Sequence, residues 1–199
     1  MFEKHAALDK VVISDGHPYF SEYNIAKQKS KLKELDAQSN YGLPSVKHLY
    51  NQHKFSSKIE MGSEDEYRKW WKDQVNVKGT DDILLTDKTG LNILFDSVKT
   101  AGNNKKATTY FKDHIITKTN EQRWSYAANL TDILTDADEI WSTRLNNDIT
   151  RIYLKYYNDA PYAIVVANKE GVMVAESMYQ LTDERAIEFR RGELIHIKR

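Results

Sequence analysis

Residues 149–177, ITRIYLKYYNDAPYAIVVANKEGVMVAES, decide the fold. Three runs rich in β-branched and aromatic residues, 149–157, 162–167 and 172–177, are separated by two short segments. Both segments carry Asn together with Asp, Pro or Gly, residues that favour tight turns. The pattern predicts three antiparallel strands joined as a meander.

The flanking segments extend this plan. Between residues 119 and 134, apolar and aromatic side chains recur with a period near 3.6, which predicts an amphipathic helix. After the meander, Thr182 is placed to cap one or two helical turns that Gly192 ends, and residues 193–198 alternate as a last strand. The C-terminal third therefore predicts an α+β fold, in which a helix is followed by a four-stranded antiparallel sheet.

The N-terminal half predicts a different organisation. Residues 21–38 have the composition of a polar helix with a thin apolar stripe, and Ser63 begins a further helix whose aromatic face we assign to the core. Residues 83–95 form two short apolar runs around a Gly-containing turn, which predicts a small hairpin.

The segment 101–106, AGNNKK, is the best candidate for a linker. It divides the chain into a mainly helical region with a small hairpin, residues 1–104, and a second domain, residues 105–199.

Composition excludes several classes of protein. The chain has 29 Lys and Arg against 29 Asp and Glu, so no overall charge draws it to nucleic acid or to an anionic membrane. The absence of Cys excludes a disulfide scaffold, a thiolate metal site and a cysteine nucleophile. No apolar run approaches a membrane span, and residues 1–10 lack the apolar region of a signal peptide. We expect no membrane partner, and any nucleic acid must be held locally.

Motifs for metals and cofactors are also missing. His48 and His53 are five residues apart, which does not place two ligands on one helix face, and there is no HExxH or calcium loop. The scattered glycines form no phosphate loop, and no GxSxG elbow is present. We therefore expect no metal and no cofactor.

The remaining chemistry rests on imidazole, cationic and hydroxyl groups. Strand periodicity puts cations and phenols on one face of the first meander strand, and His114 precedes the amphipathic helix. Such a face suits a phosphodiester, because cations stabilise added negative charge and imidazole moves protons near neutral pH. The candidate residues are His114, Arg123, Arg151, Tyr153, Lys155, Tyr157, Ser177, Arg190 and Arg191.

Each candidate also has an ordinary structural role. A His near a helix start often caps it, strand Lys and Arg often face water, and Tyr often packs. Residue chemistry by itself leaves an enzyme and a non-catalytic domain both open.

Five segments carry a resemblance to a known family. They are YGLPSVKHLY (41–50), Arg123, DADEIW (136–141), RIYLK (151–155) and FRRGELI (189–195). In this order they resemble the phage-associated barnase, EndoU, colicin E5/D and RelE-like (BECR) nuclease domains. Such domains commonly end Mu F-like phage head proteins and serve as the tips of polymorphic toxins.

The resemblance implies a metal-independent ribonuclease of α+β fold that attacks with the ribose 2′-OH and leaves a 2′,3′-cyclic phosphate. Carried over to this sequence, His114 is the general acid or base, Arg123 holds phosphate, Lys155 and Arg191 neutralise the transition state, and Ser177 bonds a phosphate oxygen. Arg151, Tyr153, Tyr157 and Arg190 would then contact the substrate. In the family signature at 138–141, we interpret Trp141 and its neighbouring carboxylates as structural.

The resemblance also implies partners. RNA is the expected substrate, a cognate immunity or inhibitor protein is expected to cover the sheet face, and a phage or toxin polypeptide is the expected carrier. The expected location is the cytoplasm of the producing or target bacterial cell, or a virion or larger secreted toxin. Many such nucleases are basic, whereas this chain is neutral. One tRNA loop as substrate, contacts supplied by a partner, or a non-catalytic module of a phage head protein would each fit that neutrality.

Overall fold

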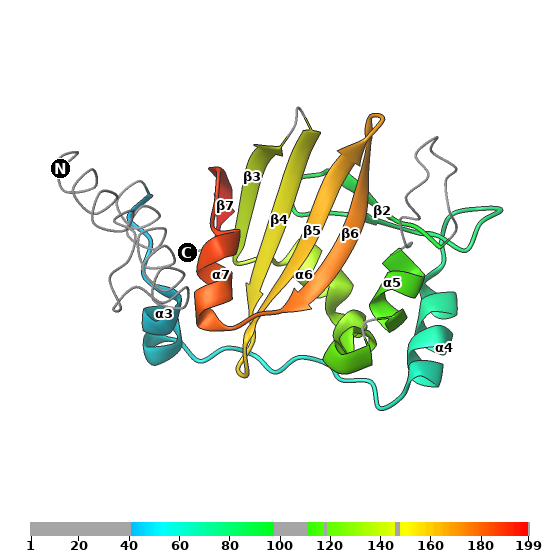
Figure 1. Cartoon of the computed structure of the whole chain (residues 1–199), viewed down its shortest axis with the longest axis horizontal. Coiled ribbons are helices and arrows are strands. Elements are labelled where there is room, and N and C mark those ends of the chain that lie inside the picture. The colour runs from blue at the N-terminus through cyan, green and yellow to red at the C-terminus, as the bar shows by residue number, and fades with distance from the viewer. Residues whose placement is uncertain (1–40, 98–110, 118, 146–147, 199) are drawn as a thin grey trace, which may run out of the picture.

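The computed structural model describes residues 41–97, 111–117, 119–145 and 148–198 (Figure 1). These residues form a seven-stranded sheet with α-helices and two 3₁₀-helices around it. The elements are α3 (Val46–Gln52), α4 (Glu64–Gln74), β1 (Ile83–Thr86), β2 (Asn92–Phe95), α5 (Phe111–Thr117), η1 (Thr119–Glu121), η2 (Arg123–Asn129), α6 (Leu130–Thr135), β3 (Glu139–Leu145), β4 (Asp148–Tyr156), β5 (Pro161–Lys169), β6 (Val172–Gln180), α7 (Asp183–Phe189) and β7 (Glu193–Ile197).

The strands lie in the order β1-β2-β6-β5-β4-β3-β7. The predicted meander is confirmed, because β4, β5 and β6 pair antiparallel in sequence order. The predicted last strand is present as β7, but it pairs with β3 at the opposite side of the sheet from β6. The α+β class is therefore confirmed, and the expectation of four strands is wrong.

Two parts of the main sheet were not included in the four-stranded prediction. The hairpin at residues 83–95 is confirmed, but its second strand also pairs in parallel with β6 at Leu94 and Val174, so it belongs to the main sheet. Residues 139–145 form a strand although part of this segment reads as a polar turn. Its polar positions are compatible with a strand because Glu139 has a buried partner, described below, and antiparallel partners on both sides satisfy the backbone.

The helix ends follow local capping chemistry. The Ser63 hydroxyl accepts a hydrogen bond from the Glu66 N–H (3.2 Å), and the Glu66 carboxylate in turn accepts one from the Gly62 N–H (2.7 Å). Thr182 caps α7 as expected, through a bond from the Arg185 N–H (3.3 Å). These side chains satisfy N–H groups that a helix leaves without internal partners.

Residues 119–134 depart from the predicted amphipathic helix. The segment begins as two 3₁₀-helices and becomes α-helical only at Leu130. Gln122, between the two 3₁₀-helices, has a left-handed backbone (φ 43°), which interrupts any continuous α-helix there. The apolar periodicity nevertheless corresponds to a buried side, since Ala127, Leu130 and Ile133 are buried.

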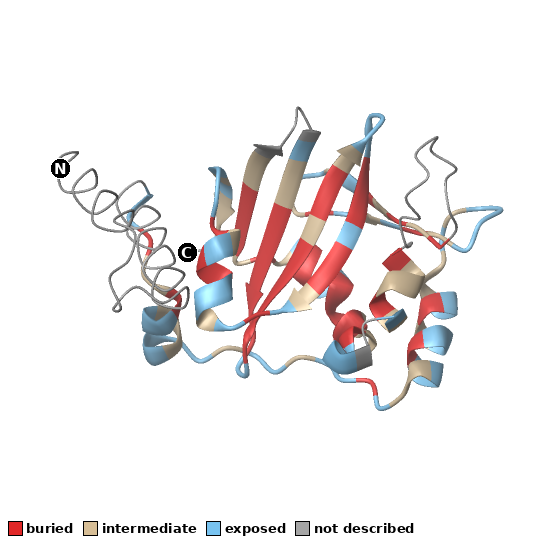
Figure 2. Cartoon of the chain, in the orientation of Figure 1, coloured by how far each residue is buried: buried red, intermediate tan, exposed pale blue. Residues whose placement is uncertain are grey.

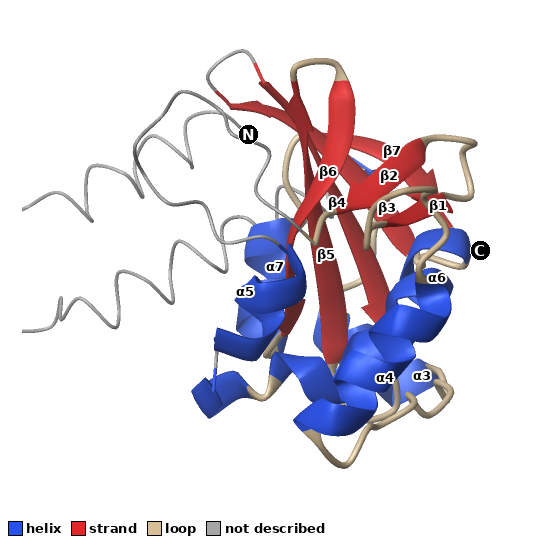
Figure 3. Cartoon of the chain, turned by 90° about the vertical axis from the view of Figure 1, so that its right-hand side faces the viewer, coloured by secondary structure: helices blue, strands red, loops and turns tan. Residues whose placement is uncertain are grey.

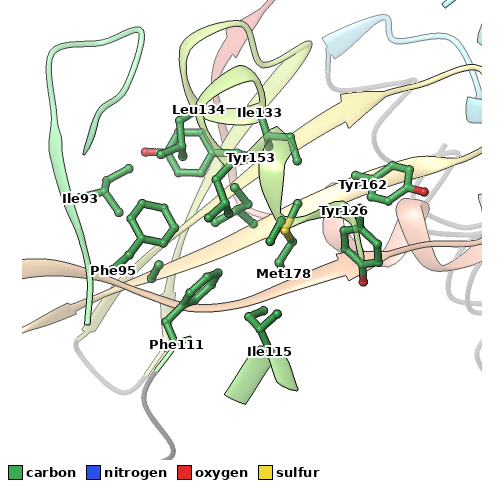
Figure 4. Close-up of a cluster of buried hydrophobic side chains, with 14 of the residues drawn as sticks. Ile93, Phe95, Phe111, Ile115, Tyr126, Ile133, Leu134, Tyr153, Tyr162 and Met178 are labelled. Carbon is green, nitrogen blue, oxygen red and sulfur yellow. The ribbon is translucent and has the colours of Figure 1, made fainter. Parts of the chain in front are cut away.

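The sheet has a hydrophobic cluster on each face. Buried residues run along the central strands (Figure 2), and helices lie on both sides of the sheet (Figure 3). On β4, Tyr153 belongs to one cluster and its neighbour Ile152 to the other, as strand alternation requires. The larger cluster also contains Tyr67 and Trp71 of α4, which confirms the assignment of that aromatic face to the core. Figure 4 shows how Phe95, Phe111, Tyr126 and Met178 converge in it from separate elements.

Two predicted features, the helix at 21–38 and the linker at 101–106, lie outside the described residues. Within the described part of the chain, no helix has the length and apolar character needed to cross a lipid bilayer.

Candidate active site

A bulge in β6 positions the first residue of the candidate site. Val165 of β5 pairs with Ser177, whereas the next residue, Val166, pairs with Ala175, so Glu176 is an extra residue in β6. Bulges change the direction of neighbouring side chains and occur frequently beside active sites. The pairing of β2 with β6 is at Val174, so Ser177 lies beyond it, where its hydroxyl meets side chains from α5 and η2. Figure 1 shows α5 beside β6.

Two helical segments bring the other members of the site. His114 lies on α5, whose Phe111 and Ile115 are anchored in the larger hydrophobic cluster. Arg123 opens η2, immediately after the left-handed Gln122, and only 4% of its surface is exposed. The left-handed backbone of Gln122 directly precedes Arg123, whose guanidinium is held in one direction. Strained backbone conformations are common at functional sites.

The three side chains meet. The Arg123 Nη1 donates to the Ser177 hydroxyl (2.5 Å), and the same hydroxyl lies 3.1 Å from His114 Nε2. The Arg123 Nη1 is also 3.5 Å from His114 Nε2. An imidazole, a guanidinium and a hydroxyl therefore lie within hydrogen-bonding distance of one another. His114 and Ser177 are nevertheless 63 positions apart in the sequence.

Two further groups fix the direction of Arg123. The Glu121 Oε2 accepts from Arg123 Nε (2.8 Å) and lies 2.7 Å from its Nη2, which leaves Nη1 directed at Ser177. The guanidinium also stacks on the ring of Tyr179 (4.4 Å), and Arg185 approaches the same ring (5.7 Å). A guanidinium held by a fork of hydrogen bonds and an aromatic face is well ordered for binding an anion.

A cavity of about 350 Å³ lies beside the cluster formed by His114, Arg123 and Ser177. Glu121, which holds Arg123, also lines the cavity. The other lining residues are near the site in sequence or belong to α7 and its N-cap. The complete lining is Asn120, Glu121, Tyr126, Gln180, Leu181, Thr182 and Arg185.

A comparison with protein families identifies the chain's relatives. Residues 70–197 match the model of a family described as phage-Barnase-EndoU-ColicinE5/D-RelE like nuclease2. The chain belongs to this nuclease family. The match spans more than half of the chain and includes His114, Arg123 and Ser177. Neither a curated protein nor a solved structure matches the chain.

Lys155 lies elsewhere in this nuclease-family chain. It is on β4, two strands from β6, and is 5% exposed. Its ammonium donates to the backbone oxygen (2.7 Å) and the carboxylate (2.5 Å) of Asp136, where Lys198 also binds. Hydrogen bonds from these two lysines lower the pKa of Asp136 to about 2.

Two predicted substrate contacts on β4, Arg151 and Tyr153, hold the β1–β2 turn. Tyr153 donates its hydroxyl to the buried Asp87 carboxylate (2.6 Å), and Arg151 reaches the same oxygen (3.2 Å). Burial acts to raise the pKa of Asp87, but hydrogen bonds from Tyr153, Leu91 and Thr89 outweigh it and hold that pKa below its usual value. Tyr157, also on this face, donates to Asp132 of α6 (2.6 Å).

The adjacent arginines Arg190 and Arg191 have different surroundings. Arg190 is buried and forms an ion pair with Glu139, which also accepts from the Trp141 indole (2.9 Å) and the Tyr156 hydroxyl (3.0 Å). This agrees with the structural interpretation of the 138–141 segment. Arg191 is exposed between α7 and β7. The structure therefore brings together His114, Arg123 and Ser177, and places Lys155 and Arg191 apart from them.

Sequence reasoning missed Glu121 and Tyr179. Glu121 could have been found because it lies two residues before Arg123. Tyr179 could have been found because it lies two residues after Ser177 on the same strand. Within the described residues, no three His, Asp or Glu side chains gather in an arrangement able to hold a metal ion.

Proposed function

We propose that the protein is a metal-independent ribonuclease that cleaves RNA by attack of the ribose 2′-OH on the neighbouring phosphate. The convergence of His114, Arg123 and Ser177 carries this proposal. Membership of the nuclease family supports a phosphodiester as the substrate.

Each of the three groups has a role in this reaction. The 2′-oxygen forms a bond to phosphorus, the 5′-oxygen leaves, and the products are a 2′,3′-cyclic phosphate and a 5′-hydroxyl. His114 moves a proton at the 2′- or the 5′-oxygen. Arg123 stabilises the extra negative charge on the phosphorane through Nη1, and Ser177 bonds a phosphate oxygen.

We also propose a biological setting for this enzyme. A ribonuclease of this kind acts as a toxin carried by a phage or toxin polypeptide, and a cognate inhibitor must protect the producing cell. The zero net charge favours a selective enzyme, because no general attraction to RNA supplements the contacts at the site.

The decisive experiment uses purified protein and total RNA in excess EDTA. We expect cleavage, with products ending in 2′,3′-cyclic phosphate. A substrate with 2′-O-methyl groups throughout should resist cleavage because its nucleophile is blocked.

Two results would overturn the proposal. Failure of a folded preparation to cut any RNA would leave the chain as a non-catalytic module. Cleavage of the methylated substrate, or of DNA, would exclude the 2′-OH mechanism.

A further inference from the structure

The cavity beside His114, Arg123 and Ser177 is lined by both apolar and polar residues. Its wall includes Tyr126 and Leu181, which are 2% and 3% exposed. Asn120 and Gln180, two exposed residues with side-chain amides, are also among the lining residues. Binding sites for small molecules commonly combine apolar walls with a few polar groups, at volumes of roughly 300–1,000 Å³. A cavity of about 350 Å³ therefore suits one small ligand.

The walls of the cavity are held rigidly. The Tyr126 hydroxyl accepts a hydrogen bond from the Gln180 N–H (3.1 Å), which joins η2 to the end of β6. Burial raises the pKa of Tyr126 to about 12. The Leu181 N–H donates to the Pro161 carbonyl (2.8 Å), which fixes the next residue along the chain.

The position of the cavity relates it to the phosphate chemistry. Glu121 lines the cavity and also holds Arg123. Arg185 lines the cavity and approaches the Tyr179 ring on which Arg123 stacks. A group in the cavity would therefore contact residues that hold or adjoin the Arg123 guanidinium.

We propose that this cavity holds the base of the nucleotide next to the scissile phosphate, and that Asn120 and Gln180 select the base. The inference rests on the proposed ribonuclease function. An amide offers a donor and an acceptor side by side, as the hydrogen-bonding edge of a base does. Because RNA-binding proteins recognise sequence through unpaired bases, the substrate is single-stranded at the cleavage site. Selection by a base also accounts for specific binding without net positive charge.

The test uses short DNA strands that carry a single ribonucleotide, because 2′-OH attack can cut such strands only after that residue. One series varies the ribonucleotide among the four bases, and a second series varies the nucleotide that follows it. We expect the protein to prefer one base by about tenfold or more in one of the series.

Substitutions then assign that preference. Asn120→Ala, Gln180→Ala and the double variant should reduce the preference toward equal rates for the four bases. Gln52→Ala, at the exposed end of α3, is the matched control and should keep the full preference. Both cavity amides are exposed, so their truncation should not unfold the chain.

The outcomes separate the two proposals. Cleavage at the ribonucleotide without base preference, or a preference unchanged in the double variant, overturns the base site and leaves the ribonuclease function standing. Absence of cleavage in every strand and in total RNA overturns both.

Discussion

At the residue scale, the candidate site depends on the geometry of one guanidinium. Arg123 uses Nε and Nη2 toward Glu121, and it uses Nη1 toward Ser177. A lysine retains the positive charge but cannot make this fork of bonds. We expect Arg123→Lys to lower kcat/KM for RNA by roughly 100-fold, as loss of a directed donor does in other enzymes.

The control for this change is Arg68→Lys, because Arg68 is half exposed and pairs only loosely with Glu64 (3.8 Å). Both variants should keep the far-UV circular dichroism of the parent. Full activity in Arg123→Lys would show that charge without direction is sufficient.

The imidazole gives a second prediction at this scale. His114→Ala should abolish cleavage, and toxicity on expression, because the proton donor or acceptor at the reacting oxygens is lost. His48→Ala, on the exposed side of α3, should retain activity. Thermal unfolding of both variants should match the parent, and retained toxicity in His114→Ala would remove this residue from the site.

Sequence could indicate the members of the site by chemical type but could not select among them. His114, Arg123 and Lys155 are equally plausible phosphate ligands until their partners are known. Lys155 is engaged by Asp136, a pairing that depends on how β4 packs against the α6–β3 junction. Arg190 likewise owes its burial to Glu139, which is 51 residues away.

At the element scale, the turn before β7 contains a position that only glycine fits. Gly192 has φ +82°, and a Cβ there would lie 2.1 Å from the Ser142 carbonyl oxygen of β3. Gly192→Ala should lower the free energy of unfolding by about 2–4 kcal/mol, because backbone strain and a backbone clash add. Urea denaturation measures the change.

Gly79→Ala separates the two causes. Gly79 has nearly the same φ, +83°, but no atom lies within 4 Å of an added Cβ. We expect this control to cost only about 1 kcal/mol, the strain of the backbone alone. Equal losses in the two variants would contradict a clash between Gly192 and β3.

Elements with strong local signals were predictable, whereas those that depend on tertiary contacts were not. The meander has two turns of clear chemistry and long β-rich runs, and it is present. The 3₁₀ geometry before α6 occurs together with the left-handed backbone of Gln122. The periodicity of the apolar side chains indicates neither feature. The seven-stranded sheet requires β2 to reach β6 across a sequence separation of 80 residues, a pairing that local patterns do not indicate.

At the scale of the whole molecule, Asp136 joins separate parts of the chain through Lys155 of β4 and Lys198 after β7. Its folded pKa, about 2, lies below the ordinary value of 3.8. Its stabilising contribution is therefore fully present above about pH 4 and is lost as the pH falls toward 2. Asp136→Asn should lower stability at about pH 6, and the difference from the parent should narrow as the pH approaches 2.

Urea denaturation at several pH values measures this difference. Asp81→Asn is the control, since its side chain is 72% exposed and its ion pair with Lys112 is long (3.8 Å). A difference independent of pH would contradict the ion-pair explanation.

The last prediction concerns where the folding unit begins. The segment before residue 105 supplies Tyr67, Trp71 and Phe95 to the larger cluster, and β2 pairs with β6. The Tyr67 hydroxyl also donates to the Lys112 carbonyl (3.0 Å), across the proposed boundary. A fragment of residues 105–199 would expose the surface that these aromatic side chains cover, so we expect it to lack a cooperative unfolding transition. A fragment of residues 41–199 should retain one in urea, measured by tryptophan fluorescence. A cooperative transition of 105–199 at the midpoint of the full chain would instead support a domain boundary at the segment 101–106.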